Sequence, residues 1–508
     1  MAINSNSLAA ANGVGITNTQ FTPAVGLLPR KLVLVGQYLT GKTPVEDVAV
    51  QVLSPNDTAD RTGFGGPLHR LHIWANKTLQ NVPVHIIPQA EAGGATAAAG
   101  SIVVTGPATA NGTLYLYVAG ELVEVPVSDG DTATDIGDAI ESAINADINL
   151  AVTASNAAGT VTVTCKAKGT YGNFITLEQN LGFGQETPAG VSLVLTDLTG
   201  GATDPDIDDA LAGTNLNQEW FTDLMHAYDP VATNLDKLSV YNGIANTQSG
   251  LYDNLIFRPF QSMIGDTVAG SGGFTAIKAL ADARKTDRTN GAVSVPGSPN
   301  HPAEIAAVAQ AIVASIGASD DGFGASDTVG QILTDVLPGD SADRWTDDYD
   351  SRDAAVKFGS CPTIFEDGVV KMQNAVTFYH PDAVADENNG YRFKANISKI
   401  WNIANSEKVN FSQDRWKGVV VVDDVSLASN NNKARDVDAV IADHIALINA
   451  WETNGWIFQG EFSKDNLTVT LRVTGTGFDS DVPVILSGIG GITDTKILFD
   501  TSFRTFLQ

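Results

Sequence analysis

The chain has 508 residues, of which 43% are hydrophobic and 17% are charged, and its 58 acidic and 30 basic side chains leave a net charge of −28. This length predicts about three domains with sizeable apolar cores. An acidic surface repels nucleic acid and anionic membranes, and no apolar stretch reaches the roughly 18 residues of a membrane span, so we expect neither direct nucleic-acid binding nor membrane insertion.

The first 29 residues carry no ionisable side chain. They are too polar for a core, and they lack the basic start and the sustained apolar run of a secretion signal. Strand propensity remains at five positions: Val14, Ile16, Thr19, Phe21 and Val25. We interpret residues 1–29 as an N-terminal arm that can add a strand to the sheet edge of another copy or a partner, with a frayed terminus as the alternative.

The next stretch predicts a βαβ unit, with a buried strand at 31–35, a helix at 68–79 and a second strand at 82–87. The composition then changes. Residues 93–204 are rich in Gly, Ala and Thr and contain only Lys166 and Lys168 as basic residues. This break indicates a separate domain inserted into a loop.

Within the insertion, strands at 114–118 and 121–127 flank Ala119-Gly120 as a hairpin, and a further strand follows at 161–164. Thr132 and Asp135 have the spacing of a helix capping box. The apolar residues that follow them share one helix face: Ile136, Ala139, Ile140, Ala143 and Ile144. The insertion is therefore predicted to have mixed α and β character.

After Pro205 the sequence again alternates between helix and strand patterns. The predicted elements are helices at 274–288 and 302–316, strands at 292–295, 369–379 and 467–473, and a helix at 433–451 with Val437, Val440, Ile441, Ile445 and Ile448 facing inward. The last residues are apolar and β-prone, with Ile497, Leu498, Phe499 and Phe503 as candidate contacts of a second arm.

One motif favours nucleotide hydrolysis. Residues 36–43 fit G-x-x-x-x-G-K-[ST] after an apolar strand, and the stretch 418–424 is an apolar strand ending in carboxylates. Pro44 follows the motif at once, however, and the valines of 45–53 indicate a strand rather than the helix that would face a phosphate. A surface turn is the better interpretation, and a P-loop NTPase stays as an alternative.

Other polar groups predict no catalytic, cofactor or metal site. His69, His72 and His85 lack a Cys or carboxylate at ligand spacing, so we expect partly exposed helix histidines at the first two positions. Two acidic clusters lack the pattern of a calcium loop and are expected to cap helices: Asp204, Asp206, Asp208 and Asp209, and Asp347, Asp348, Asp350 and Asp353. Cys165 and Cys361 lie in different predicted domains, so we expect no disulfide.

Three segments together resemble one family. Residues 30–37 followed by Gly63-Phe64-Gly65-Gly66 before a helix are similar to the opening of contractile-tail sheath proteins, particularly those of Mu-like bacteriophages. Residues 367–379 resemble the C-terminal sheath module, and residues 168–173 resemble the segment inserted in phage sheaths. The resemblance covers essentially the whole chain.

The resemblance implies a structural protein, not an enzyme. The implied fold is α/β multidomain, with a subtilisin-like sheath domain without protease chemistry, an outward-facing insertion, and a C-terminal α/β domain nearest the tail axis. The corresponding limits are an arm at 1–29, a discontinuous sheath domain at 30–92 and 205–360, an inserted surface domain at 93–204, a C-terminal domain at 361–491 and an arm at 492–508.

The resemblance also implies the partners and the setting. Copies would stack as rings around a tail tube and contract, with the tube, baseplate and tail terminator proteins as partners, no cofactor, assembly in the host cytoplasm and a place in the virion tail. Both arms would lend strands to the C-terminal domains of neighbouring copies.

An acidic secreted adhesin with β domains is a further alternative.

Overall fold

The computed structural model describes residues 27–213, 216, 218–230, 232–243, 249–319, 322–324, 326–381, 389–425 and 431–488. Contacts divide the chain into two compact units. The larger unit runs from Leu28 to Trp401 and includes Gly488, and the smaller unit contains Leu27 and residues 402–487. The division falls within one long helix.

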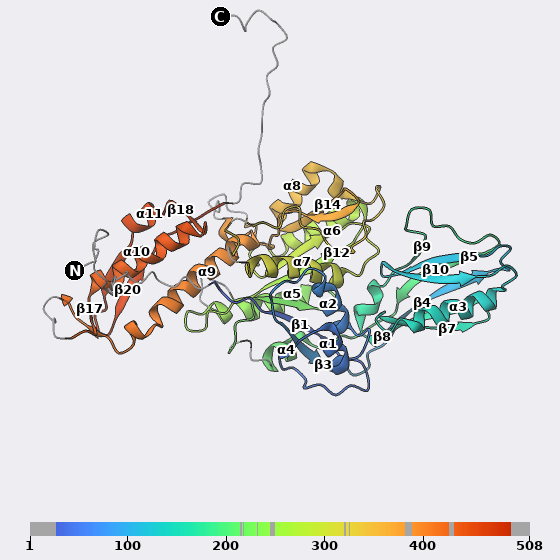
Figure 1. Cartoon of the computed structure of the whole chain (residues 1–508), viewed down its shortest axis with the longest axis horizontal. Helices are drawn as coiled ribbons and strands as arrows, with labels where there is room; N and C mark the ends of the chain where they lie inside the picture. The colour runs from blue at the N-terminus through green and yellow to red at the C-terminus, as the bar shows by residue number, and fades with distance from the viewer. Residues whose placement is uncertain are drawn as a thin grey trace, which may run out of the picture. The chain divides into compact units, whose positions relative to one another are not determined.

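The larger unit is built on a central sheet of eight strands in the order β15-β14-β13-β12-β11-β1-β3-β2 (Figure 1). Its strands are β1 (Leu32–Gln37), β2 (Val50–Val52), β3 (Val84–Gln89), β11 (Asp223–His226), β12 (Gln261–Asp266), β13 (Asn290–Ser294), β14 (Ser360–Glu366) and β15 (Val369–Met372). The six inner strands are parallel, and the two edge strands β2 and β15 are antiparallel to their neighbours. This pattern confirms the predicted βαβ unit.

Helices cover both faces of the sheet, as expected for parallel strands with apolar runs. The helices of this layer structure are α1 (Pro55–Thr62), α2 (Pro67–Asn76), α4 (Ile207–Gly213), α5 (Ala232–Asn242), α6 (Gly270–Asp282), α7 (Pro302–Gly317) and α8 (Tyr349–Phe358). Leu32 and Leu34 pack in the core that contains α2 and α7, whereas Val33 and Val35 pack in the core that contains α4 and α5. The strand period of two therefore sends alternate side chains of β1 into two different cores.

The insertion forms two antiparallel sheets that pack with one helix (Figure 1). Its elements are β4 (Ala97–Thr105), β5 (Gly112–Val118), β6 (Glu121–Val127), α3 (Ala133–Ala146), β7 (Val152–Ala157), β8 (Thr160–Lys168), the 3-10 turn η1 (Thr170–Phe174), β9 (Leu177–Gln179) and β10 (Ser192–Thr199). The predicted hairpin is present, and Ala119 and Gly120 at its tip have φ values of 50° and 78°. The capping box of Thr132 and Asp135 is also confirmed.

The smaller unit contains helices and short ladders. Its elements are the end of α9 (Lys394–Phe411), β16 (Val420–Val421), β17 (Ala434–Arg435), α10 (Val437–Thr453), β18 (Ile457–Phe458), α11 (Gly460–Asp465), β19 (Thr468–Leu471), β20 (Phe478–Asp481) and β21 (Ile485–Leu486). The strands pair in three ladders of two: β16 with β17, β18 with β21, and β19 with β20. Its core packs Leu447, Ile448 and Trp451 of α10 against Trp456 and Ile457.

Two predicted strands are wrong in extent. The strand predicted at 369–379 ends at Met372 as β15, which pairs with β14 through a tight hairpin at Asp367 and Gly368, whose φ values are 56° and 79°. The chain then leaves the sheet edge, and Val376 and Phe378 enter the core with no exposed surface. The strand predicted at 467–473 is limited to β19, and its expected inward residue Val473 is fully exposed.

Two helices also differ from their predicted limits. Helix α6 ends at Asp282 rather than 288, where the Arg284 guanidinium donates a hydrogen bond to the Leu280 carbonyl oxygen. Helix α10 begins at Val437 because Asp436 accepts a hydrogen bond from the Ala439 amide. Its buried face includes Val440, His444, Leu447, Ile448 and Trp451, whereas the predicted inward residues Val437, Ile441 and Ile445 are half-buried.

The predicted boundary near 361 differs from the division of the contacts. Strand β14 begins at Ser360 and pairs with β13, so it completes the parallel part of the central sheet. The two compact units divide after Trp401. A composition shift does not reveal this division, because it falls inside a continuous helix.

Candidate functional site

The phosphate-loop motif forms a turn without a following helix. β1 ends at Gln37, Gly41 has a φ of 92°, and the chain continues through irregular backbone to β2. The Lys42 ammonium group donates a hydrogen bond to the carbonyl oxygen of Asp60 at 2.9 Å. A phosphate site at a helix start needs several free backbone N–H groups aimed at one point, and this loop lacks that geometry.

The carboxylate strand that could have completed a nucleotide site is also short. Only Val420 and Val421 form a strand, β16, which pairs in parallel with β17 of the smaller unit. Residues 36–43 belong to the larger unit. The structure therefore assigns the two parts of the motif to separate compact units.

The three candidate metal ligands have other partners. His69 accepts a hydrogen bond from the Gly65 amide at 2.9 Å, and His72 Nδ1 lies 2.7 Å from Thr58 Oγ1. Both histidines are buried rather than partly exposed, and burial lowers the pKa of each to about 4. His85 lies edge-on to Phe221. Across the described ranges, no three His, Cys, Asp or Glu side chains are grouped so that they could hold a metal ion.

The acidic clusters lie partly at helix starts, as predicted, but Asp204 accepts hydrogen bonds from Thr170 and Asp353 pairs with Lys357 within α8. Asp208 and Asp209 are in the first turn of α4, and Asp348 accepts a hydrogen bond from the Ser351 amide at the start of α8. Both cysteines are free and buried. The described residues also include no helix of the length and apolarity needed to cross a membrane.

The insertion contacts the position at which ligands bind in many α/β sheets. β3 and β11 lie on opposite sides of β1, so the carboxyl ends of β1 and β11 mark the point where the strand order reverses. The insertion contacts this point, because the Gln37 side-chain amide donates a hydrogen bond to the Lys168 carbonyl oxygen. Asp204 accepts a hydrogen bond from the Thr170 amide at 2.7 Å.

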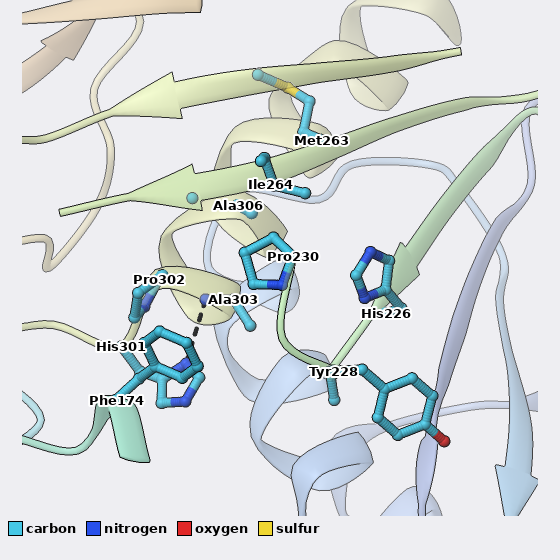
Figure 2. Close-up of a pocket in the computed structure, with 12 residues that line it drawn as sticks. Phe174, His226, Tyr228, Pro230, Met263, Ile264, His301, Pro302, Ala303 and Ala306 are labelled. Carbon is cyan, nitrogen blue, oxygen red and sulfur yellow. Dashed lines mark hydrogen bonds between the residues drawn. The ribbon is translucent and has the colours of Figure 1, made fainter. Parts of the chain in front are cut away.

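A small cavity remains at this edge of the sheet (Figure 2). His226 of β11, His301 at the start of α7 and Phe174 of the insertion contribute to its lining. Its volume is about 20 Å³, which is room for about one water molecule rather than for a substrate. Neither ring nitrogen of His226 has a hydrogen-bond partner, and burial lowers the pKa of this side chain to about 4.

A buried ionic cluster joins the insertion to the central domain. The Arg70 guanidinium donates from Nε and Nη2 to both carboxylate oxygens of Glu304, at 2.7 and 3.0 Å, and from Nη1 to Glu121 of the insertion at 2.8 Å. The Tyr171 hydroxyl donates to Glu304 at 2.9 Å, and its ring stacks on His301 at 4.0 Å.

Electrostatics favour the ionised form of this cluster. Burial acts to raise the pKa of Glu304, but the charge and hydrogen bonds of Arg70 outweigh it, and the net shift is downward. Arg70 and Glu304 are 234 positions apart in the chain, so no local motif could have indicated this pair. The cluster fixes the insertion to α2 and α7 through several charge-assisted hydrogen bonds.

The predicted arm contacts cannot be placed. Val14, Ile16, Thr19, Phe21, Ile497, Leu498, Phe499 and Phe503 all lie outside the described residues.

No model of a known protein family matches the chain. The chain is 26% identical over 406 residues, which cover 79% of each chain, to the Mu-like prophage FluMu tail sheath protein of Haemophilus influenzae. The resemblance predicted from the sequence is confirmed. The chain is similar to contractile-tail sheath proteins.

Two solved structures have weak similarity to the chain. The sheath tail protein from Desulfitobacterium hafniense is 13% identical, with a TM-score of 0.46 over 93% of this chain and 100% of that chain. The sheath of an extracellular contractile injection system in its contracted state is 10% identical, with a TM-score of 0.46 over 97% and 99% of the two chains.

Proposed function

We propose that this chain is the structural subunit of a phage contractile tail sheath. Copies polymerise around the tail tube, and the polymer contracts to drive the tube through the host envelope. The observation that carries this proposal is the likeness to the Mu-like prophage tail sheath protein along 79% of both chains. We propose no catalytic step, a view supported by the contact of the insertion with the end of β1 and by the turn at Lys42.

The proposed domain plan follows the sheath family. The discontinuous central domain has a subtilisin-like arrangement without protease chemistry, residues 93–204 face outward, and the C-terminal domain lies nearest the tail axis. The position of the insertion supports this plan, because it interrupts the connection between β3 and α4.

The terminal arms are proposed to lend strands to the C-terminal domains of neighbouring copies. The two-stranded ladders of the smaller unit support this role, because an isolated two-stranded ladder is marginal in water and an open edge can accept another strand. Apolar side chains remain exposed beside these ladders, including Val473, Leu471 and Ile485. Main-chain hydrogen bonds between copies would persist while subunits rotate during contraction.

Interface energy is the proposed source of the work of contraction. A helical lattice needs heterologous contacts that do not close on themselves. At roughly 25 cal/mol per Å² of apolar surface, about 200 Å² of additional contact contributes about 5 kcal/mol per subunit before ordering costs. No nucleotide is then required. The proposed partners are other copies, the tail tube, the baseplate and the tail terminator, in a virion tail assembled in the host cytoplasm.

Electron microscopy of the purified chain tests the proposed function. We expect tubes or stacked rings with a regular helical repeat. Discrete monomers that bind Mg-ATP would instead support the NTPase alternative, and monomers that decorate cells would support an adhesin.

A further inference from the structure

Lys394, the first residue of α9, lies in the interior of the larger unit with no exposed surface. Lysine is almost never fully buried unless an acidic group pairs with it. Its ammonium nitrogen Nζ instead contacts two neutral oxygens, the Ser262 carbonyl at 2.9 Å and Gln310 Oε1 at 3.4 Å. Among the described residues, no carboxylate oxygen lies within 4.0 Å of Nζ, which is the limit for an ion pair.

Gln310 of α7 lies between this amine and a buried carboxyl group. Its side-chain nitrogen Nε2 donates a hydrogen bond to Asp223 Oδ1, and the Thr222 hydroxyl donates to Asp223 Oδ2 at 2.6 Å. Lys394, Gln310 and Asp223 have no exposed surface. The amide of Gln310 is therefore held with its oxygen toward an amine and its nitrogen toward a carboxyl group.

The surroundings favour the reactive form of each group. Burial lowers the pKa of Lys394 to about 7, so a large share of the amine is unprotonated and nucleophilic near neutral pH. Burial also raises the pKa of Asp223, although Arg30 acts in the opposite direction. A carboxyl group beside an amide nitrogen can transfer a proton to that nitrogen as it leaves.

We propose that Lys394 and Gln310 join in an intramolecular isopeptide bond, with Asp223 as the acid and base of the reaction. The amine Nζ attacks the amide carbon Cδ of Gln310, and a new Nζ–Cδ bond forms. The Cδ–Nε2 bond then breaks, and ammonia leaves. Asp223, which is hydrogen-bonded to Nε2, gives a proton to Nε2 as it leaves. The new bond attaches Nζ to the carbon that carried Nε2, and the proton that Nζ releases then returns to the Asp223 carboxylate, so the step needs no oxidant, reductant or co-reactant.

The reaction is intramolecular, which reduces its entropic cost because the folded chain already holds the reacting groups together. The bond would join α7 to the start of α9 across 84 positions of sequence. Such a link ties the beginning of α9 covalently to the central domain. This proposal goes beyond the sheath function and does not depend on it.

Intact-mass spectrometry of the full chain tests the proposal. We expect a mass lower than the sequence mass by about 17 Da, the mass of ammonia, together with a branched tryptic peptide that contains Gln310 and Lys394. The variants Lys394→Met and Asp223→Asn should each show the full mass of their sequence. Circular dichroism and thermal melting establish whether each variant folds.

Gln89→Met is the matched control. Gln89 is a buried glutamine of β3, in the same sheet as Asp223, and its amide contacts Asp47, Asp206 and Tyr228 rather than a lysine. This variant should retain the loss of about 17 Da. Wild-type protein that is folded, has the full sequence mass and yields only linear peptides would overturn the proposal.

Discussion

The inserted domain and the smaller compact unit differ in how their strands pair within the region itself. The insertion closes a four-stranded and a three-stranded sheet over α3, whose Ile136, Ile140 and Ile144 have no exposed surface. The smaller unit has a tryptophan-rich core, but its described strands pair only in twos. Among the described residues, the strands of the insertion pair within larger sheets, whereas each ladder of the smaller unit keeps edges to which the proposed arm strands would add.

The largest expected effect is the loss of assembly when the arms are removed. Deleting residues 1–22, or residues 492–508, should leave a folded and soluble subunit that forms no tubes, because the open ladders then receive no strand. Electron microscopy and sedimentation measure the polymer, and thermal melting measures the fold. Normal polymers from either truncation would contradict strand exchange.

A substitution pair sharpens this test. Val14→Asp, Ile16→Asp and Phe21→Asp together should block assembly, because a charge that replaces an apolar side chain of an added strand opposes the burial of that side chain. Asn4→Asp, Asn6→Asp and Asn12→Asp add the same charge to the same arm at polar positions, and this control should assemble.

The next effect concerns the junction between the insertion and the central domain. Arg70→Met should destabilise the chain by about 3–5 kcal/mol, because it leaves Glu304 buried without its cation. Urea unfolding measures the change. Lys357→Met removes an exposed ion pair with Asp353 and should leave the unfolding midpoint almost unchanged. Equal losses of unfolding free energy in the two variants would show that the buried Arg70 cluster adds no more stability than an exposed ion pair.

Acid should lower the stability of the central domain more than that of the insertion. His69, His72 and His226 have folded pKa values of about 4, below the ordinary value of 6.5, so the folded chain binds fewer protons than the unfolded chain. Their contribution to stability is present above pH 6.5 and is lost as the pH falls toward 4. The insertion, residues 93–204, contains no histidine.

Two versions of the protein test this difference. The first is the isolated segment 93–204, and the second is the chain with that segment replaced by a short Gly/Ser linker, which should still assemble. Between pH 7 and pH 5, the free energy of unfolding measured with urea should fall in the second version and change little in the first. A steeper loss in the isolated segment would contradict this assignment, and failure of the linker version to fold would show that the insertion belongs to the central core.

A smaller effect is expected at the helix cap of the insertion. Thr132→Ala removes the hydroxyl that accepts a hydrogen bond from the Asp135 amide, and it should cost about 1 kcal/mol. Thr134→Ala alters an exposed threonine two residues later in α3 and should have a smaller effect on thermal unfolding. Equal losses would mean that the cap adds nothing to the stability of α3.

The smallest effect is expected at the apparent phosphate loop. Lys42→Ala removes a single hydrogen bond to a carbonyl oxygen and should change stability by less than about 0.5 kcal/mol. Assembly should persist, and calorimetric titration with Mg-ATP should show no binding. Saturable nucleotide binding that Lys42→Ala abolishes would overturn the proposed function.

The sequence alone determined the elements that depend on local chemistry. The capping box at Thr132, the hairpin at Ala119-Gly120 and the proline at the start of α7 are all present, because caps, turns and helix starts depend on residues within a few positions of one another. The order of motifs also sufficed to suggest the family. The arm contacts stay predictions, because they lie outside the described residues.

Only the tertiary structure decided which distant groups meet. The cluster of Arg70, Glu304 and Tyr171, and the contact of Lys394 with Gln310, join residues far apart in the chain. The predicted strand at 369–379 was too long for a related reason: after the hairpin the chain turns into the core, where burial of Val376 and Phe378 outweighs their strand propensity. Local sequence patterns specify which helices and strands can form. Which distant groups pair is decided when their surfaces are buried together, because a polar group that loses water needs a partner.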